Sequence, residues 1–313
     1  MGTDLVKSYT RYDFGLSDLS ISAIDDQNRD IMYQIKDNLV TNCGGVVVSS
    51  SDSSTADATD NWSTSTDLVW NTGAHSWIVI QFDSITTGVQ LCIDLSRAYS
   101  SSETGTILIS ADGFTGGTTT NRPTASDEAA VVTDSNWGGS NFASLTKQYS
   151  IIKTTDNTII YIIGFVNGGP TCFWLLGKAV NGPTLHDTPM FAYVTNIAPL
   201  SSSISSGAYF RTIIDSEPAS CYVLRPYSGI DPIASGGYYT SGFDIEGNIM
   251  MWSHSFISSS PSRPGSYGYF PDLYWVNTTH SDLQYIYQSD GSTLGWIVYG
   301  DFALPCGSTI IPR

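Results

Sequence analysis

The sequence predicts a mainly β protein: an antiparallel β-sandwich or jelly-roll-like fold with one N-terminal helix and long Ser/Thr/Gly-rich loops. The composition favours this class, since only 13% of the 313 residues are charged and 41% are hydrophobic, while Ser, Thr, Asn and Gly supply most of the remaining polarity. The pattern also favours it, because short runs rich in β-branched and aromatic residues recur between turn sequences that contain glycine. Regularly spaced short strands are typical of sandwiches and barrel-like sheets.

The longest apolar stretch, residues 158–180, predicts a β-hairpin in the middle of a sheet. Its two arms are rich in β-branched and aromatic side chains, and Asn-Gly-Gly-Pro between them allows the positive φ angles of a tight reversal. The first arm, IIYIIGFV, is apolar almost throughout, which is typical of a strand covered on both faces. Gly164 and Gly177 indicate bulges or close backbone approach. A buried helix segment is the alternative, but glycine and proline interrupt the run often enough to disfavour it.

The chain begins with residues 1–20, in which polar and aromatic residues alternate without a helical period. We expect an extended N-terminal arm here. Its larger apolar side chains need a surface outside the segment to bury against, so we predict that the arm docks on a neighbouring subunit. The contact residues expected in this inter-subunit arm are Leu5, Tyr9, Tyr12 and Phe14.

Residues 25–42 predict the one helix. Ile24, Ile31, Ile35 and Leu39 recur at helical spacing, and acidic residues occupy the other faces. The Gly44-Gly45 pair is a typical helix end.

Further strands are predicted on both sides of the hairpin. Before it they fall at 45–50, 68–70, 76–82, 89–95, 106–110 and 149–154, and after it at 190–194, 208–214, 221–224, 248–253 and 294–303. Loops rich in Ser, Thr and Gly are predicted at 51–66, 112–128 and 258–269. The connection at 112–128 is too long for a simple turn, and we expect it to cover a sheet edge or to make a contact.

The stretch SSSISS at 201–206 is typical of a linker, and Tyr and Pro become more frequent after it. We therefore place a domain boundary near residue 197. The predicted organisation is an extended arm at 1–20, a helix plus β-sandwich domain at 21–196, and a second β-rich region at 197–313. Strands of the last region can alternatively complete the first sheet, which would make the whole chain one domain.

Charge and reactive residues argue against several classes of function. A formal net charge of −16, from 13 basic and 29 acidic residues, argues against a nucleic-acid partner. The five cysteines and four histidines are widely spaced and lack metal-ligand spacing, so we predict no metal and no cofactor. No GxSxG motif is present, and we do not expect an enzyme. No signal-like apolar leader or membrane-length apolar run is present either, which predicts synthesis in a cytoplasm and no membrane partner.

The eight tryptophans can serve either the core or a ligand surface. Those inside apolar runs, such as Trp174, are assigned to the core. Trp62, Trp137 and Trp275 lie less clearly inside such runs, and they are the candidates for ligand stacking or subunit contact. Together with the acidic, β-rich composition they suit a carbohydrate-binding (lectin-like) β-sandwich module, which is the alternative function.

Several stretches together resemble the structural proteins of tailed-bacteriophage virions. They are VKSYTRYDFG before the helix, ADGFTGGTTTNRPTASDE in the long loop, FWLLGKA at the end of the hairpin, and the late sequences YGYFPDLYWV and GWIVYGDFALP. The corresponding patterns in that group are an aromatic-rich start, a Gly-Phe-x-Gly-Gly…Arg-Pro-Thr-Ala-x-Asp-Glu loop and a late turn like Leu-Pro-Gly-Leu-Tyr. The resemblance spans nearly the whole chain. It departs at Asp272, where a glycine is expected, and over 216–262, which match nothing in the group.

The resemblance implies a non-enzymatic structural component of the virion, made in the host cytoplasm. Such a protein mediates subunit assembly at the neck or tail, or on the capsid surface as a decoration protein. The expected partners are other virion proteins and further copies of the chain in a homo-oligomer, and no catalytic residues carry over. For the carbohydrate-binding alternative, the ligand would be a host-surface glycan used in attachment. A third class, a hydrolase, predicts a cluster of carboxylates in a groove. The sequence offers no compact pair, although Asp244 and Glu246 alternate along a possible strand and would point to one face.

Overall fold

The computed structural model describes most of the first 178 residues and shorter segments beyond them. The described residues are 4–17, 20, 24–51, 70–71, 74–94, 105–118, 122–134, 147–166, 169–178, 190–196, 210–214, 217–224, 243–245, 249–253, 255–258, 266–268, 270–276, 284–299, 302–306 and 309–312.

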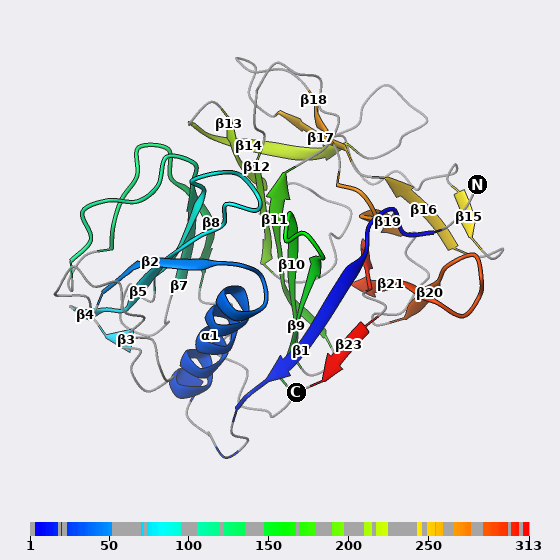
Figure 1. Cartoon of the computed structure of the whole chain (residues 1–313), viewed down its shortest axis with the longest axis horizontal. Helices are drawn as coiled ribbons and strands as arrows, with labels where there is room; N and C mark the ends of the chain where they lie inside the picture. The colour runs from blue at the N-terminus through cyan, green and yellow to red at the C-terminus, as the bar shows by residue number, and fades with distance from the viewer. Residues whose placement is uncertain are drawn as a thin grey trace.

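The fold is mainly β with one described helix, as the sequence predicts (Figure 1). The central sheet has ten described strands in the order β18 (Ser266–Gly268), β17 (Ser255–Ser258), β14 (Glu217–Leu224), β13 (Phe210–Ile214), β12 (Met190–Asn196), β11 (Gly169–Lys178), β10 (Ile159–Val166), β9 (Lys147–Thr154), β1 (Tyr9–Gly15) and β23 (Thr309–Pro312). Most neighbours in this sheet are also neighbours in the sequence. They pair antiparallel, whereas β1 and β23 pair in parallel.

Two further sheets flank the central one in Figure 1. The five-stranded sheet has the order β2 (Val46–Ser50), β5 (Trp77–Gln81), β6 (Gln90–Asp94), β7 (Gly105–Ser110) and β8 (Ala129–Asp134). The six-stranded sheet has the order β15 (Phe243–Ile245), β16 (Ile249–Ser253), β19 (Tyr274–Val276), β22 (Phe302–Pro305), β21 (Leu294–Tyr299) and β20 (Tyr285–Tyr287). A small ribbon joins β3 (Trp70–Asn71) to β4 (Ala74–His75).

The predicted central hairpin is present as β10 and β11, which pair antiparallel and lie between β9 and β12 in the sheet. Both glycines have the expected roles. The register between the strands shifts at Gly164, which marks a bulge. At Gly177, an added Cβ would lie 2.9 Å from the ring of Phe270, so only glycine allows this close approach. Trp174 in β11 is 1% exposed, in agreement with its assignment to the core.

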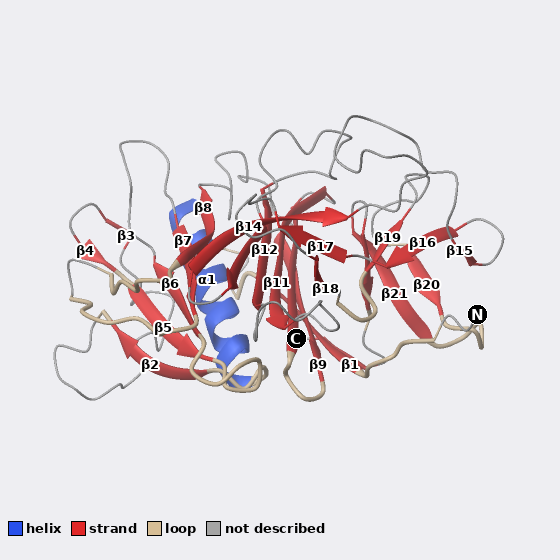
Figure 2. Cartoon of the chain, turned by 90° about the horizontal axis from the view of Figure 1, so that it is seen from above, coloured by secondary structure: helices blue, strands red, loops and turns tan. Residues whose placement is uncertain are grey.

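The predicted helix is α1 (Ile24–Thr41), which lies between the ten-stranded and five-stranded sheets (Figures 1 and 2). Ile31, Ile35 and Leu39 of its apolar stripe are buried and belong to one hydrophobic cluster with residues of both sheets. The helix ends before Gly44, whose positive φ of 74° reverses the chain toward β2. The main core is therefore a helix enclosed between two sheets.

The N-terminal segment differs from the expectation of an arm for a neighbouring subunit. Residues 9–15 form β1, an inner strand that pairs with β9 on one side and β23 on the other. Tyr9 and Phe14 are buried within this same chain, and Leu5 packs against the core of the six-stranded sheet. Tyr12 is half-buried. The surface that these side chains need is thus supplied by the chain itself, through contacts with residues far away in the sequence.

Strands from both sides of residue 197 join in the ten-stranded sheet, while the described strands of the six-stranded sheet all come from the later region. Within the described part of the chain, no helix has the length and apolarity needed to cross a membrane.

Candidate functional site

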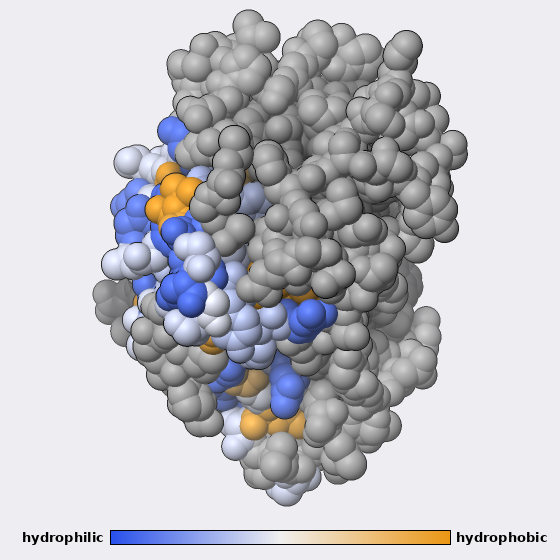
Figure 3. All heavy atoms as spheres, turned by 90° about the vertical axis from the view of Figure 1, so that its right-hand side faces the viewer, coloured by the Kyte–Doolittle hydropathy of each residue, from blue (hydrophilic) through white to orange (hydrophobic). Residues whose placement is uncertain are grey.

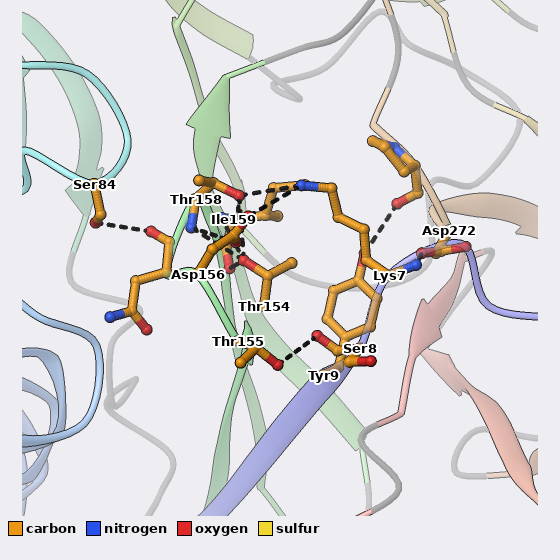
Figure 4. A network of polar contacts seen from close by, with 12 residues as sticks. Lys7, Ser8, Tyr9, Ser84, Thr154, Thr155, Asp156, Thr158, Ile159 and Asp272 are labelled. Atoms are coloured by element: carbon orange, nitrogen blue, oxygen red, sulfur yellow. Dashed lines mark hydrogen bonds and ion pairs between the residues drawn. The ribbon is translucent and has the colours of Figure 1, made fainter.

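Residues 4–8 are fastened to three distant parts of the chain by polar side chains. Figure 4 shows two of these parts, around Thr158 and around Asp272. We call this arrangement the N-terminal clasp. It consists of residues 4–8 and their partners Asp156, Thr158, Asp272, Gln288 and Ser289. Residues 4–8 belong to no described strand. Side chains accept hydrogen bonds from the backbone N–H groups of residues 5–7, and the Ser8 carbonyl accepts a backbone hydrogen bond of 3.1 Å from the Thr155 N–H.

Asp272 is the centre of the clasp. Its carboxylate accepts hydrogen bonds from the backbone N–H groups of Val6 and Lys7, at 2.8 and 3.0 Å. Its backbone carbonyl accepts a hydrogen bond of 2.9 Å from Trp296 Nε1, which ties the same residue to β21. Asp272 also has a positive φ of 64°, in the left-handed region that favours glycine. A glycine here would fit the backbone but would lack the carboxylate that holds residues 6 and 7.

The environment of Asp272 opposes its charge. Burial raises the pKa of the carboxyl group, and the backbone N–H donors of Val6 and Lys7 offset this effect only in part. Tyr9 lies close by and donates from its hydroxyl to the Pro271 carbonyl at 3.2 Å. Burial raises the pKa of both Tyr9 and Tyr161, whose ring centres lie 6.4 Å apart, so both phenols stay protonated.

The other end of the clasp is the turn between β9 and β10. Lys7 Nζ donates to Thr158 Oγ1 at 3.2 Å and lies 3.7 Å from an Asp156 carboxylate oxygen. Partial burial raises the pKa of Asp156, but hydrogen bonds from Thr154 and Thr158 outweigh it and lower that pKa to about 2. The same turn reaches the five-stranded sheet region, since Ser84 Oγ donates to the Asn157 carbonyl at 2.9 Å. The turn therefore connects the N-terminal segment with two sheets.

A third set of contacts fixes residues 4 and 5 to the loop between β20 and β21. The Leu5 N–H donates to Gln288 Oε1 at 3.2 Å, and Ser289 Oγ donates to an Asp4 carboxylate oxygen at 2.6 Å. These groups are a backbone amide, a side-chain amide, a hydroxyl and a carboxylate. They satisfy main-chain groups and each other, and so hold residues 4 and 5 against this loop.

A second polar cluster organises the long loop after β7, for which the sequence predicted a covering or contact role. Asp127 is fully buried and accepts hydrogen bonds from Ser110 Oγ and from the Ala111 N–H, the latter at 2.7 Å. Arg122 forms a two-pronged ion pair with Glu128, at 2.8 Å for each bond. The Trp77 indole donates to the Thr118 carbonyl at 2.7 Å, so the loop is held against the five-stranded sheet.

The tryptophans that the sequence singled out as ligand or contact candidates stay predictions, because their side chains lie outside the described part of the chain. Trp62 and Trp137 lie outside the described residues. Trp275 lies in β19, where its backbone pairs with Trp252 and Phe302, but its side chain lies outside the described part. Asp244 lies in β15, whereas Glu246 falls outside the described residues.

Cys43, Cys92 and Cys306 are buried free thiols. Burial raises the pKa of the Cys43 thiol to about 12, which keeps it protonated. In the described part of the chain, no three His, Cys, Asp or Glu side chains group closely enough to hold a metal ion.

Lys7 and Asp272 are not among the site residues that the sequence pattern indicated. Both act through contacts across most of the chain length, which hydrophobic periodicity does not report. One signal could have indicated Asp272, namely its place in the late turn where a glycine was expected. Comparison with protein-family models, curated proteins and solved structures finds no match for this chain.

Proposed function

We propose that the chain is a non-enzymatic structural component of a tailed-bacteriophage virion, which mediates subunit assembly at the neck or tail or on the capsid surface. Its partners in this role are neighbouring virion subunits, including further copies of itself. The sequence resemblance supports the virion setting. The clasp supports a structural role, because its polar side chains hold the chain in one shape.

The observation that carries the proposal is the exposed strand β2. Among the described strands β2 pairs with β5 alone, so it lies at the end of the five-stranded sheet. Val46 and Val48 are 63% and 37% exposed on this terminal strand. Monomeric proteins usually protect such strands with charge or cover, because an exposed apolar edge pairs readily with another chain. In an assembly protein, the same edge provides a contact for a neighbouring subunit.

The test is incorporation of the Val46→Lys variant into particles. A lysine on a terminal strand disfavours pairing with another chain, so we expect a large loss of incorporation with an unchanged melting temperature. Thr87→Lys, which places the same charge at an exposed loop position, is the matched control and should assemble normally. Normal incorporation of Val46→Lys, or absence of the wild-type protein from purified particles examined by electron microscopy, would contradict the proposal.

A further inference from the structure

The terminal strand β20 of the six-stranded sheet carries two tyrosines that point away from the core. Tyr285 and Tyr287 are 37% and 38% exposed, whereas Ile286 between them is 2% exposed and packs with Trp296. The register with β21 shifts between Ile286 and Tyr287, but burial alternates along the three residues of β20. The two tyrosines therefore stand on one face, about 7 Å apart along the strand. Figure 3 shows the side of the molecule that lies on the right in Figure 1, where the described residues are mostly hydrophilic with a few hydrophobic ones among them.

The strand that carries the two rings is held rigidly. Asp290 accepts hydrogen bonds from the Ser292 and Thr293 N–H groups, at 2.8 and 2.7 Å, and so locks the loop between β20 and β21. The Gln288 N–H donates to the Thr293 carbonyl at 2.8 Å across the same loop. Rings that are fixed before a ligand arrives lose little conformational entropy when it binds.

An oriented carboxylate lies beside the first ring. Arg11 bridges the two, since its NH1 donates to the Tyr285 hydroxyl at 3.2 Å and its Nε donates to Asp13 Oδ1 at 2.6 Å. Ser150 Oγ also donates to Asp13 Oδ1. The Asp13 side chain remains 34% exposed, so it can accept further hydrogen bonds from a ligand.

The charges around β20 select against anions. The described acidic side chains nearby are Asp4, Asp13 and Asp290, and the nearby cation Arg11 is already paired with Asp13.

A protein interface of standard size buries roughly 800 Å² per partner around an apolar centre. The two tyrosines of β20, set among polar groups, suit a smaller ligand with alternating apolar faces and hydroxyl groups.

We propose that Tyr285 and Tyr287, with Asp13 at their side, form a binding site for a neutral oligosaccharide. The C–H faces of successive sugar units stack on the two rings, and a sugar hydroxyl donates a hydrogen bond to the Asp13 carboxylate. This site is distinct from the tryptophans that the sequence suggested for stacking. It goes beyond the assembly role and does not depend on it.

The experiment is binding of the full chain to an array of neutral hexose and N-acetylhexosamine oligomers beside sialylated and uronate-containing glycans. The oligomer that binds best is then titrated by calorimetry. We expect binding confined to neutral glycans and a loss of about tenfold or more in affinity for Tyr287→Ala. Tyr287→Phe keeps the ring and should bind like the wild type, while Asp13→Asn should bind more weakly.

Val46→Ala alters an exposed apolar residue on a different sheet and is the matched control, with unchanged binding expected. Melting curves of all variants exclude loss of fold as the cause. The site is overturned if no neutral glycan binds, if Tyr287→Ala binds as well as the wild type, or if only anionic glycans bind. Loss of particle incorporation by Tyr287→Ala without any glycan binding would assign the tyrosines to a protein contact and also overturn the proposal.

Discussion

Asp272 combines a backbone angle that favours glycine with two hydrogen bonds that glycine cannot make. The left-handed conformation costs a residue with a Cβ about 1–2 kcal/mol, and aspartate tolerates it better than most residues. The two N–H groups of Val6 and Lys7 that it binds have no strand partner in the described sheets. The free-energy cost of the left-handed backbone at Asp272 is thus offset by the long-range hydrogen bonds that its side chain forms.

The backbone and side-chain contributions of Asp272 can be separated by substitution. Asp272→Gly and Asp272→Ala both remove the carboxylate, and both should lower the free energy of unfolding. The alanine variant should lose about 1 kcal/mol more, because alanine is strained at positive φ and glycine is not. Urea unfolding of the two variants measures this difference. Equal stabilities would show that the conformation at position 272 is not under strain.

Stability should also depend on pH through Asp272. Burial raises its folded-state pKa above the ordinary value of 3.8, so the folded protein binds the proton more tightly than the unfolded chain does. The stability that this tighter proton binding contributes is fully present below pH 3.8, and it is lost as the pH rises through the raised pKa of Asp272. The wild type should therefore gain stability relative to Asp272→Asn as the pH is lowered through this window.

Unfolding of the wild type and Asp272→Asn at a series of pH values tests this prediction. Asp156, whose pKa is about 2, titrates below the window and is present in both proteins, so its contribution cancels. If the free energy of unfolding changed with pH in the same way in both proteins, the prediction would be wrong.

Elements built from local patterns are the ones that the sequence predicted well. The continuous apolar run of the hairpin and the apolar stripe of α1 are properties of neighbouring residues, and both elements form where those patterns lie. In β1, by contrast, an extended segment was recognised, but its partners β9 and β23 lie far along the chain. Strands of the six-stranded sheet such as β15, β19 and β20, with three residues each, are too short to give a periodic signal.

The position of β1 inside the sheet leads to a two-step deletion experiment. Removal of residues 2–8 takes away the clasp and should lower the melting temperature while the fold remains. Removal of residues 2–16 also takes away β1 with buried Tyr9 and Phe14, and it should abolish the cooperative transition. Thermal melting monitored by circular dichroism distinguishes the two outcomes. A normal transition without residues 2–16 would show that β1 is dispensable for the core.

The central hairpin provides a test of core packing. Trp174 is 1% exposed in β11, and Trp174→Ala should cost roughly 3–5 kcal/mol because it leaves a large cavity. Trp174→Phe, which leaves a smaller cavity, should cost less. Chemical denaturation gives both values. An alanine variant with the stability of the wild type would contradict the burial of this side chain.

Across the whole molecule, the clasp and the sheets join regions that the sequence alone would divide. Strands β13, β14 and β23 extend the sheet that contains β9–β12, and Phe270 packs at Gly177 of the hairpin. The predicted boundary near residue 197 rested on composition, which reports local flexibility but not strand pairing. The structure favours mutual dependence of the two regions, and this has a direct test.

The fragment 1–196 should lack a cooperative thermal transition when it is produced alone, because β1 and β12 each lose one of their two neighbours in the sheet. Co-expression with the fragment 197–313 should restore a transition and yield a complex that co-purifies. Independent cooperative melting of the fragment 1–196 would instead establish it as a domain.

The parallel pairing of β1 with β23 also constrains how the protein is made. Thr10 lies opposite Thr309 in this pair, so the chain must be synthesised beyond residue 309 before β1 gains its second neighbour. Contacts between residues so far apart in sequence slow folding, since a very long loop must close first. Until then one side of β1 is available to any extended segment nearby, including that of another nascent chain on the same messenger RNA. Protection of this strand during translation, by a chaperone or by slow release from the ribosome, would therefore determine how much of the protein reaches its native state.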